Sequence, residues 1–180
     1  NASSQLLDFA PNGHFIREIG QKVYGFAYPH TIRYDDDDNL WVIYKGANTA
    51  VRFDPEGYVT LNLGRRPEGP DEHEHVEAAE AVAVDSFFGG PTDVTWDPEG
   101  NIFISDGYVN SRITKFDRHG NWITSWGSYG SRPGQFDLPH SIDADRDGNI
   151  YVADRANRRF QVFDSDGELL RGILRKASVA

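Results

Sequence analysis

Short apolar segments recur along the chain, and each is bounded by polar turn residues. Residues 102–104 (Ile-Phe-Ile) and 150–152 (Ile-Tyr-Val) follow an Asp-x-x-Gly-Asn sequence, at 97–101 and 145–149. Glycine adopts the positive φ of a tight turn, and β-branched and aromatic residues favour strands. Each unit continues through a polar link, a strand ending in Phe-Asp, another glycine turn and a fourth strand, such as 122–126. The pattern predicts consecutive β-hairpins and requires no helix within the repeats.

Three segments superimpose as internal repeats, and they begin at Pro29, Pro91 and Pro139. Four short antiparallel strands with a period of about 40 to 50 residues are typical of a β-propeller blade. The N-terminal LLDFAPNGHFIREIG matches only the second half of such a unit. The sequence therefore predicts an all-β, NHL-type propeller with about three and a half four-stranded blades. Its expected parts within one domain, 1–180, are a partial blade at 5–20, blades at 28–64, 91–127 and 138–174, and an insertion loop at 65–90.

Closed propellers have about four to eight blades, so three and a half blades leave open edges. Three explanations apply: a fragment of a longer, six-bladed propeller, a partner chain that completes the ring, or self-association. We favour the fragment. The acidic insertion predicts a short helix over 72–84, weakened by its β-branched residues. Its Glu-His-Glu-His sequence at 72–75 is interpreted as a solvated loop rather than a metal site, because no distant ligand is specified.

Composition narrows the classes of function. The 180 residues carry a formal net charge of −10, and a polyanion would repel such a surface, so we expect no nucleic-acid partner. There is no cysteine, which excludes disulfides and thiolate metal sites. No apolar run approaches the roughly 20 residues of a membrane helix, so we expect no membrane partner. The four aspartates at 35–38 lack EF-hand spacing and predict a polar hairpin turn.

Two repeats begin with Pro-His, at His30 and His140, where the middle repeat has Thr92. The innermost strands of a propeller begin near its central channel, so equivalent positions on different blades converge. His30 and His140 are therefore candidate ligands of one divalent metal such as zinc, which accepts neutral imidazole nitrogen. The alternative is that each histidine caps its own loop through a hydrogen bond.

Two further candidates lie on links that follow a strand, close to the same face. Tyr108, in SDGYVNSR, is either a proton donor or acceptor at the channel mouth or an aromatic plug. Arg155 either binds a substrate carboxylate through its planar guanidinium or pairs with Asp154 or a neighbouring loop. Spacing alone does not decide between these alternatives.

The segments FAYPHTI, PTDV, SDGYVNSR, PGQFDLPHSI and VADRANRR occur in this order and together resemble the NHL-repeat family. Within it they are most similar to the peptidyl-α-hydroxyglycine α-amidating lyases. That resemblance implies cleavage of a peptidyl-α-hydroxyglycine to a peptide amide and glyoxylate, at a zinc held by three histidines. His30 and His140 match two of those histidines, Tyr108 matches the base, and Arg155 matches a residue that binds substrate. It also implies a calcium ion held partly by the backbone carbonyl of Ile32, and an extracellular or periplasmic protein.

The chain departs from the lyase pattern at three places. The third histidine, the calcium-binding aspartate beside it and a further substrate arginine have no match in this sequence. Two histidines make a poor catalytic zinc site. We therefore expect the chain as given to be incomplete and to show negligible lyase activity. The alternative function is a non-catalytic propeller scaffold that binds a protein or small ligand on its loop face. No signal peptide is present at the start of the chain, so the compartment follows from the resemblance alone.

Overall fold

A computed structural model of the chain describes residues 5–20, 28–66, 78, 80, 84, 85 and 87–174. Within these residues the regular structure consists of strands and one 3-10 turn, η1 (Lys45–Ala47). The predicted all-β class is thus confirmed. The expected helix at 72–84 and the Glu-His-Glu-His sequence fall outside the described residues, apart from positions 78, 80 and 84. None of the helices in the described residues has the length and apolar character needed to cross a membrane.

The strands form three four-stranded antiparallel sheets and one two-stranded sheet. Within each four-stranded sheet the strands are neighbours in the order of the sequence, which is the meander expected of a propeller blade. The half unit at the N-terminus pairs β1 (Leu6–Phe9) with β2 (Phe15–Ile19). The three complete sheets contain β3 (Pro29–Tyr34), β4 (Leu40–Tyr44), β5 (Thr49–Phe53) and β6 (Val59–Gly64); β7 (Pro91–Trp96), β8 (Ile102–Asp106), β9 (Arg112–Phe116) and β10 (Trp122–Trp126); and β11 (Pro139–Ala144), β12 (Ile150–Asp154), β13 (Arg159–Phe163) and β14 (Leu169–Leu174).

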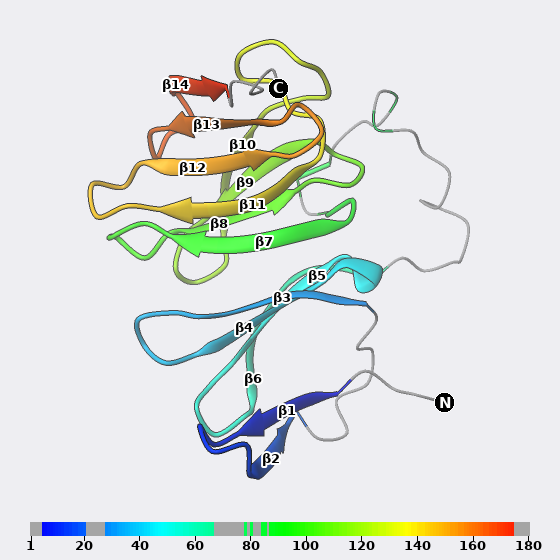
Figure 1. The fold of residues 1–180 in the computed structure, drawn as a ribbon, viewed down its shortest axis with the longest axis vertical. Coiled ribbons are helices and arrows are strands. Elements are labelled where there is room, and N and C mark those ends of the chain that lie inside the picture. Colours follow the sequence, from blue (N-terminus) through cyan, green and yellow to red (C-terminus); the bar gives the residue numbers. More distant parts are fainter. Residues whose placement is uncertain are drawn as a thin grey trace, which may run out of the picture.

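The sheets follow one another along the long axis of the molecule, from the β1–β2 hairpin to β11–β14 (Figure 1). The first strand of each complete sheet is its innermost strand, and β7 lies between β3 and β11. Asp93 on β7 shows this arrangement, because its carboxylate accepts hydrogen bonds from Arg33 on β3 and from Ser141 on β11. The starts of the three inner strands therefore converge.

Three apolar layers hold neighbouring sheets together in the described part of the chain, and β8 contributes to two of them. Ile102 and Ile104 pack with Trp41 and Ile43 of β4 on one side, whereas Phe103 packs with residues of β11–β13 on the other. A strand covered on both faces is a continuous apolar run rather than an alternating one, which explains Ile-Phe-Ile. Full burial of each such side chain stabilises the fold by about 1.5–3 kcal/mol.

The repeated aspartates are turn residues. Asp97 accepts hydrogen bonds from the backbone and side-chain nitrogens of Asn101, both at 2.8 Å. Asp35 accepts the same pair from Asn39, at 2.9 and 3.1 Å. The aspartate run at 35–38 is therefore the polar hairpin turn that the sequence predicts. These turns connect the first two strands of each blade and lie at the opposite end of the inner strands from the Pro-His sequences.

Candidate functional site

His30 and His140 occupy the second positions of β3 and β11. The residues before their prolines, Tyr28 and Leu138, have positive φ of 48° and 60°, so the chain turns in the same way into both inner strands. The two imidazole ring centroids are 4.7 Å apart, with an angle of 65° between the rings. The structure thus brings together the two histidines that the Pro-His repeats single out, although they come from different blades.

His30 has a defined orientation and tautomer. Its Nδ1 lies 2.7 Å from the carbonyl oxygen of Thr92, and the hydroxyl of Thr31 donates to the same oxygen at 2.8 Å. A carbonyl only accepts, so Nδ1 carries the proton, and in the neutral form of the ring Nε2 carries the lone pair. A backbone carbonyl bound to one ring nitrogen is the usual arrangement around a metal-binding histidine. The other nitrogen of His30 is therefore the one available to a ligand.

Tyr108 completes a three-ring cluster. Its ring centroid is 5.8 Å from that of His30 and 6.0 Å from that of His140. The Nζ atom of Lys45 lies 3.5 Å from the Tyr108 ring centroid, within cation–π distance. Gly90 has φ of +75°, and a Cβ built there would stand 2.6 Å from the Cβ of Tyr108. Only glycine at position 90 allows Tyr108 this close approach to the start of the inner strand.

The surroundings of His140 favour its neutral form. Burial lowers the pKa of His140 below its ordinary value of 6.5, and the nearby His30, Arg155 and Lys45 lower it further, against an opposing effect of Asp93. The positive charges of Arg155 and Lys45, and of His30 when it is protonated, make a further positive charge on His140 unfavourable. His140 is therefore neutral at pH 7, which is the state in which imidazole binds a metal.

Arg155 lies on the third complete blade with an exposed side chain, and its charge acts on His140. The alternative in which Arg155 pairs with Asp154 is wrong, since Asp154 accepts hydrogen bonds from Arg159 Nε at 2.7 Å and from Asn157 at 2.9 Å. The preceding blade repeats the pair, with Arg112 Nε 3.0 Å from Asp106. This aspartate–arginine pair is a structural feature of two blades, and the first complete blade has Tyr44 and Thr49 at the equivalent positions.

Sequence reasoning missed Lys45, although the repeats contained a signal for it. Lys45 directly follows β4 as Arg155 directly follows β12. Their backbone N–H groups make equivalent bonds, to the carbonyl oxygens of Tyr28 at 3.2 Å and Leu138 at 3.1 Å. Aligning NLWVIYK with NIYVADR would have revealed a second cation at the position of Arg155.

No third metal ligand joins the histidines within the described parts of the chain, because no group of three or more His, Asp or Glu side chains there is arranged to hold a metal. Ile32 lies two residues after His30 on β3, paired in register with Val42, and its side chain is exposed. The calcium role of the Ile32 carbonyl stays a prediction. The described residues therefore supply two imidazole ligands for a zinc ion and no third ligand.

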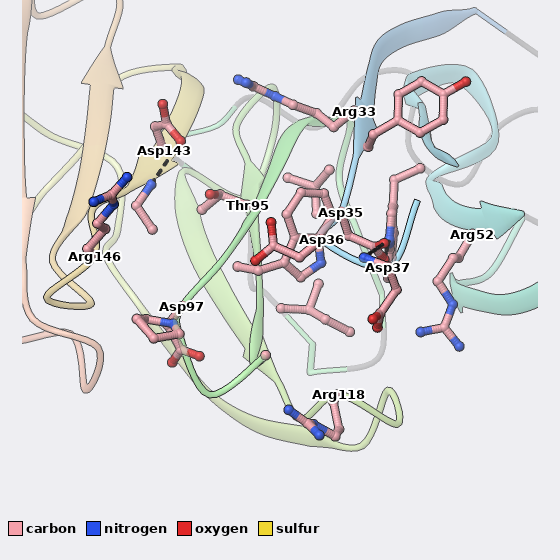
Figure 2. A pocket seen from close by; sticks show the side chains of 18 of the residues that line it. Arg33, Asp35, Asp36, Asp37, Arg52, Thr95, Asp97, Arg118, Asp143 and Arg146 are labelled. Atoms are coloured by element: carbon pink, nitrogen blue, oxygen red, sulfur yellow. Dashed lines mark hydrogen bonds between the residues drawn. The ribbon is translucent and has the colours of Figure 1, made fainter. Parts of the chain in front are cut away.

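A cleft of about 850 Å³ opens at the other end of the inner strands, lined by charged side chains of both signs (Figure 2). His30, His140, Tyr108 and Arg155 are not among its lining residues. Its carboxylates include Asp97, which is already bound to the nitrogens of its own turn. The cleft is thus separate from the cluster that the repeats predict.

Residues 136–163 match the family model of the NHL repeat. The chain is an NHL-repeat β-propeller protein. The matched span of this NHL-repeat protein runs from the residues before β11 to the end of β13, so it contains both His140 and Arg155. Streptogramin B lyase has a similar fold, with a TM-score of 0.66 at 16% identity, over 98% of this chain and 49% of that one.

Sequence relatives include amidating enzymes. The chain is 35% identical over 164 residues to peptidylglycine alpha-amidating monooxygenase of Rattus norvegicus, and this match covers 86% of the chain and 15% of the relative. It is 33% identical over 144 residues to a probable peptidyl-alpha-hydroxyglycine alpha-amidating lyase of Caenorhabditis elegans, and this match covers 78% of the chain and 38% of the relative. It is 38% identical over 177 residues to NHL repeat-containing protein 3 of Homo sapiens, and this match covers 92% of the chain and 47% of the relative. The NHL-repeat protein is related to the amidating lyases and spans less than half the length of each of these relatives.

Proposed function

We propose that this chain is part of a metal-dependent propeller of the amidating-lyase type, with the His30–His140–Tyr108 cluster as its active centre and a peptidyl-α-hydroxyglycine as substrate. The observation that carries the proposal is the convergence of these three side chains from three blades, with ring centroids 4.7 to 6.0 Å apart. Relatives named as amidating enzymes support the class of reaction.

The two histidines fit a zinc ion as part of its ligand set. The Thr92 carbonyl fixes the orientation of His30, and the lowered pKa of His140 keeps that imidazole neutral. A catalytic zinc takes three protein ligands and keeps one open position. His30 and His140 would therefore need a further ligand beyond the described residues, and we expect weak zinc binding and negligible lyase activity from this chain by itself. Bound zinc would polarise the substrate hydroxyl.

The protein's own side chains would bind the substrate and move one proton. Arg155 would bind the substrate carboxylate through its planar guanidinium. Tyr108, acting as the phenolate, would accept the proton of the substrate hydroxyl while the carbon–nitrogen bond breaks and that oxygen becomes the aldehyde oxygen of glyoxylate. The same proton then passes to the amide nitrogen, so the products are the peptide amide and glyoxylate and no other reactant is needed.

The second candidate is a non-catalytic propeller that binds a ligand on this face. It is favoured by the absence of a third metal-binding side chain from the described residues. Both candidates use the same cluster, and they differ in whether the two histidines bind a metal.

Zinc titration by calorimetry, with elemental analysis after dialysis, tests the proposal. We expect the wild type to bind zinc and both His30→Ala and His140→Ala to lose that binding. His119→Ala is the matched control, because His119 is exposed on a turn outside the cluster. Absence of zinc binding by the wild type would favour the non-catalytic scaffold. Strong, chelator-sensitive release of glyoxylate from this chain would show that two histidines suffice, against our expectation.

A further inference from the structure

Two cations flank the histidine pair at equivalent positions of different blades. Lys45 follows β4 directly and Arg155 follows β12 directly, and their backbone N–H groups make the same bond to the residue before the Pro-His sequence. Lys45 Nζ contacts the face of the Tyr108 ring, and both cations act electrostatically on His140. Lys45, Tyr108 and Arg155 thus come from three consecutive blades and surround one site.

Neither cation is neutralised by a carboxylate in the described residues, since the ion pairs found there involve other side chains. The carboxylate that acts on His140, Asp93, is buried and already bound by Arg33 and Ser141. Two cations that act on the same histidine and have no carboxylate partner among the described residues are notable in a chain with a net charge of −10. Fixed positive charges beside a ligand site attract and hold an anion.

We propose that Lys45 is a second anion-binding residue of this site, which holds the carboxylate of an acylated glycine together with Arg155 and keeps the Tyr108 ring against the two histidines. The class of ligand rests on the proposed function. The two cations contribute differently, because guanidinium is a planar fork that orients a carboxylate and ammonium is a compact point charge. Lys45 therefore supplies attraction and position, and Arg155 supplies orientation.

N-benzoylglycine is the probe for this proposal, because it carries the carboxylate and the acylated nitrogen but lacks the α-hydroxyl that the cleavage of the carbon–nitrogen bond requires. Calorimetric or NMR titration of the metal-free chain compares the wild type with Lys45→Met, Lys45→Arg and Arg155→Met. Arg146→Met is the matched control, since it removes the same charge from the turn after β11, beside the separate cleft. N-benzoylglycinamide, which lacks the negative charge, is the control ligand.

Loss of one charge-assisted contact predicts about tenfold weaker binding of N-benzoylglycine to Lys45→Met and to Arg155→Met. Lys45→Arg and Arg146→Met should stay within about twofold of the wild type, and N-benzoylglycinamide should bind weakly to every variant. In a chain labelled with 3-fluorotyrosine, the resonance that Tyr108→Phe removes should shift in Lys45→Met and much less in Lys45→Arg.

Wild-type-like binding by Lys45→Met, equal losses in Lys45→Met and Lys45→Arg, or no binding of N-benzoylglycine to the wild type would each overturn the inference. If Lys45→Met fails to fold, Lys45→Gln provides the same test with a polar side chain. The titration uses no metal, so it is independent of the proposed lyase centre. Charge-dependent binding without zinc binding would overturn only the proposed function, and zinc binding without any effect of Lys45 would overturn only this inference.

Discussion

The guanidinium of Arg33 on β3 binds the carboxylate of Asp93 on β7 through two hydrogen bonds, of 3.0 and 2.8 Å. Asp93 is only 2% exposed, and it also accepts bonds from the Ser141 hydroxyl at 2.7 Å and the Ile142 amide at 3.2 Å, both on β11. One carboxylate therefore joins the inner strands of three blades. The strands that it joins are those that carry the two histidines, so it helps to set the distance between them.

Replacing Asp93 with Ala should lower the free energy of unfolding by about 2–4 kcal/mol, because Arg33 loses its partner and the groups on β11 lose their acceptor. Urea unfolding followed by circular dichroism measures this. Asp8→Ala is the control, since its ion pair with Arg17 at 3.3 Å is partly exposed and should contribute at most about 1 kcal/mol. Equal effects of the two substitutions would show that Asp93 does not join the blades.

Gly90→Ala should be clearly more destabilising than Gly134→Ala. Both glycines have positive φ, +75° and +80°, so alanine costs about 1–2 kcal/mol of backbone strain at either position. A methyl group at position 90 would also collide with Tyr108, whereas nothing lies within 4 Å at position 134. We expect about 1–3 kcal/mol of additional destabilisation at Gly90, together with a shift of the Tyr108 resonance. Similar unfolding energies and an unmoved Tyr108 signal would contradict this account.

Asp154 and Arg155 are neighbours in the sequence with different roles. Asp154→Ala should cost about 3–5 kcal/mol, because it leaves the largely buried Arg159 guanidinium without its carboxylate. Arg155→Ala should change stability by less than about 0.5 kcal/mol, because its side chain is exposed, and should impair binding of N-benzoylglycine. Thermal unfolding and the binding titration together separate the two. A stability loss in Arg155→Ala as large as that in Asp154→Ala would make Arg155 structural.

Asp145 should contribute to acid sensitivity. The side chain of Asn149, followed by its backbone N–H, stabilises the ionised carboxylate and lowers the pKa of Asp145 below its ordinary value of 3.8. In the pH window between the lowered pKa of the folded state and the ordinary pKa of the unfolded state, the unfolded state binds more protons than the folded state. The stabilisation is therefore complete above pH 3.8 and is lost as the pH falls through the folded-state pKa.

Carboxyl carbon NMR of the folded chain, with unfolding midpoints measured between neutral and acidic pH, checks this. Asp145→Asn should reduce the decline of stability in acid, because amide side chains do not titrate in this window. An Asp145 carboxyl that titrates at or above its ordinary value would refute the prediction.

Much of the fold was predictable from the sequence because it depends on neighbours along the chain. The Asp-x-x-Gly-Asn sequences predicted turns, and Asp97 and Asn101 form one through bonds within five residues. The Pro-His repeats also predicted that His30 and His140 lie close together, and their ring centroids are 4.7 Å apart because equivalent positions of the repeats converge at the inner strands. The sequence did not reveal the partner of Asp154 or the contact between Lys45 and Tyr108, since both depend on how side chains lie across links and blades.

The sequence by itself determined the period of the repeat, the type and order of the strands, and the residue types available for chemistry. These follow from local backbone preferences and from the spacing of apolar residues, and both are properties of a segment that do not depend on its tertiary contacts. Only the tertiary structure decided which side chains meet: His30 with His140, Lys45 with Tyr108, and Asp93 with Arg33. Such contacts join residues more than 50 positions apart, and they form only when the blades pack and bring their inner strands within hydrogen-bonding distance.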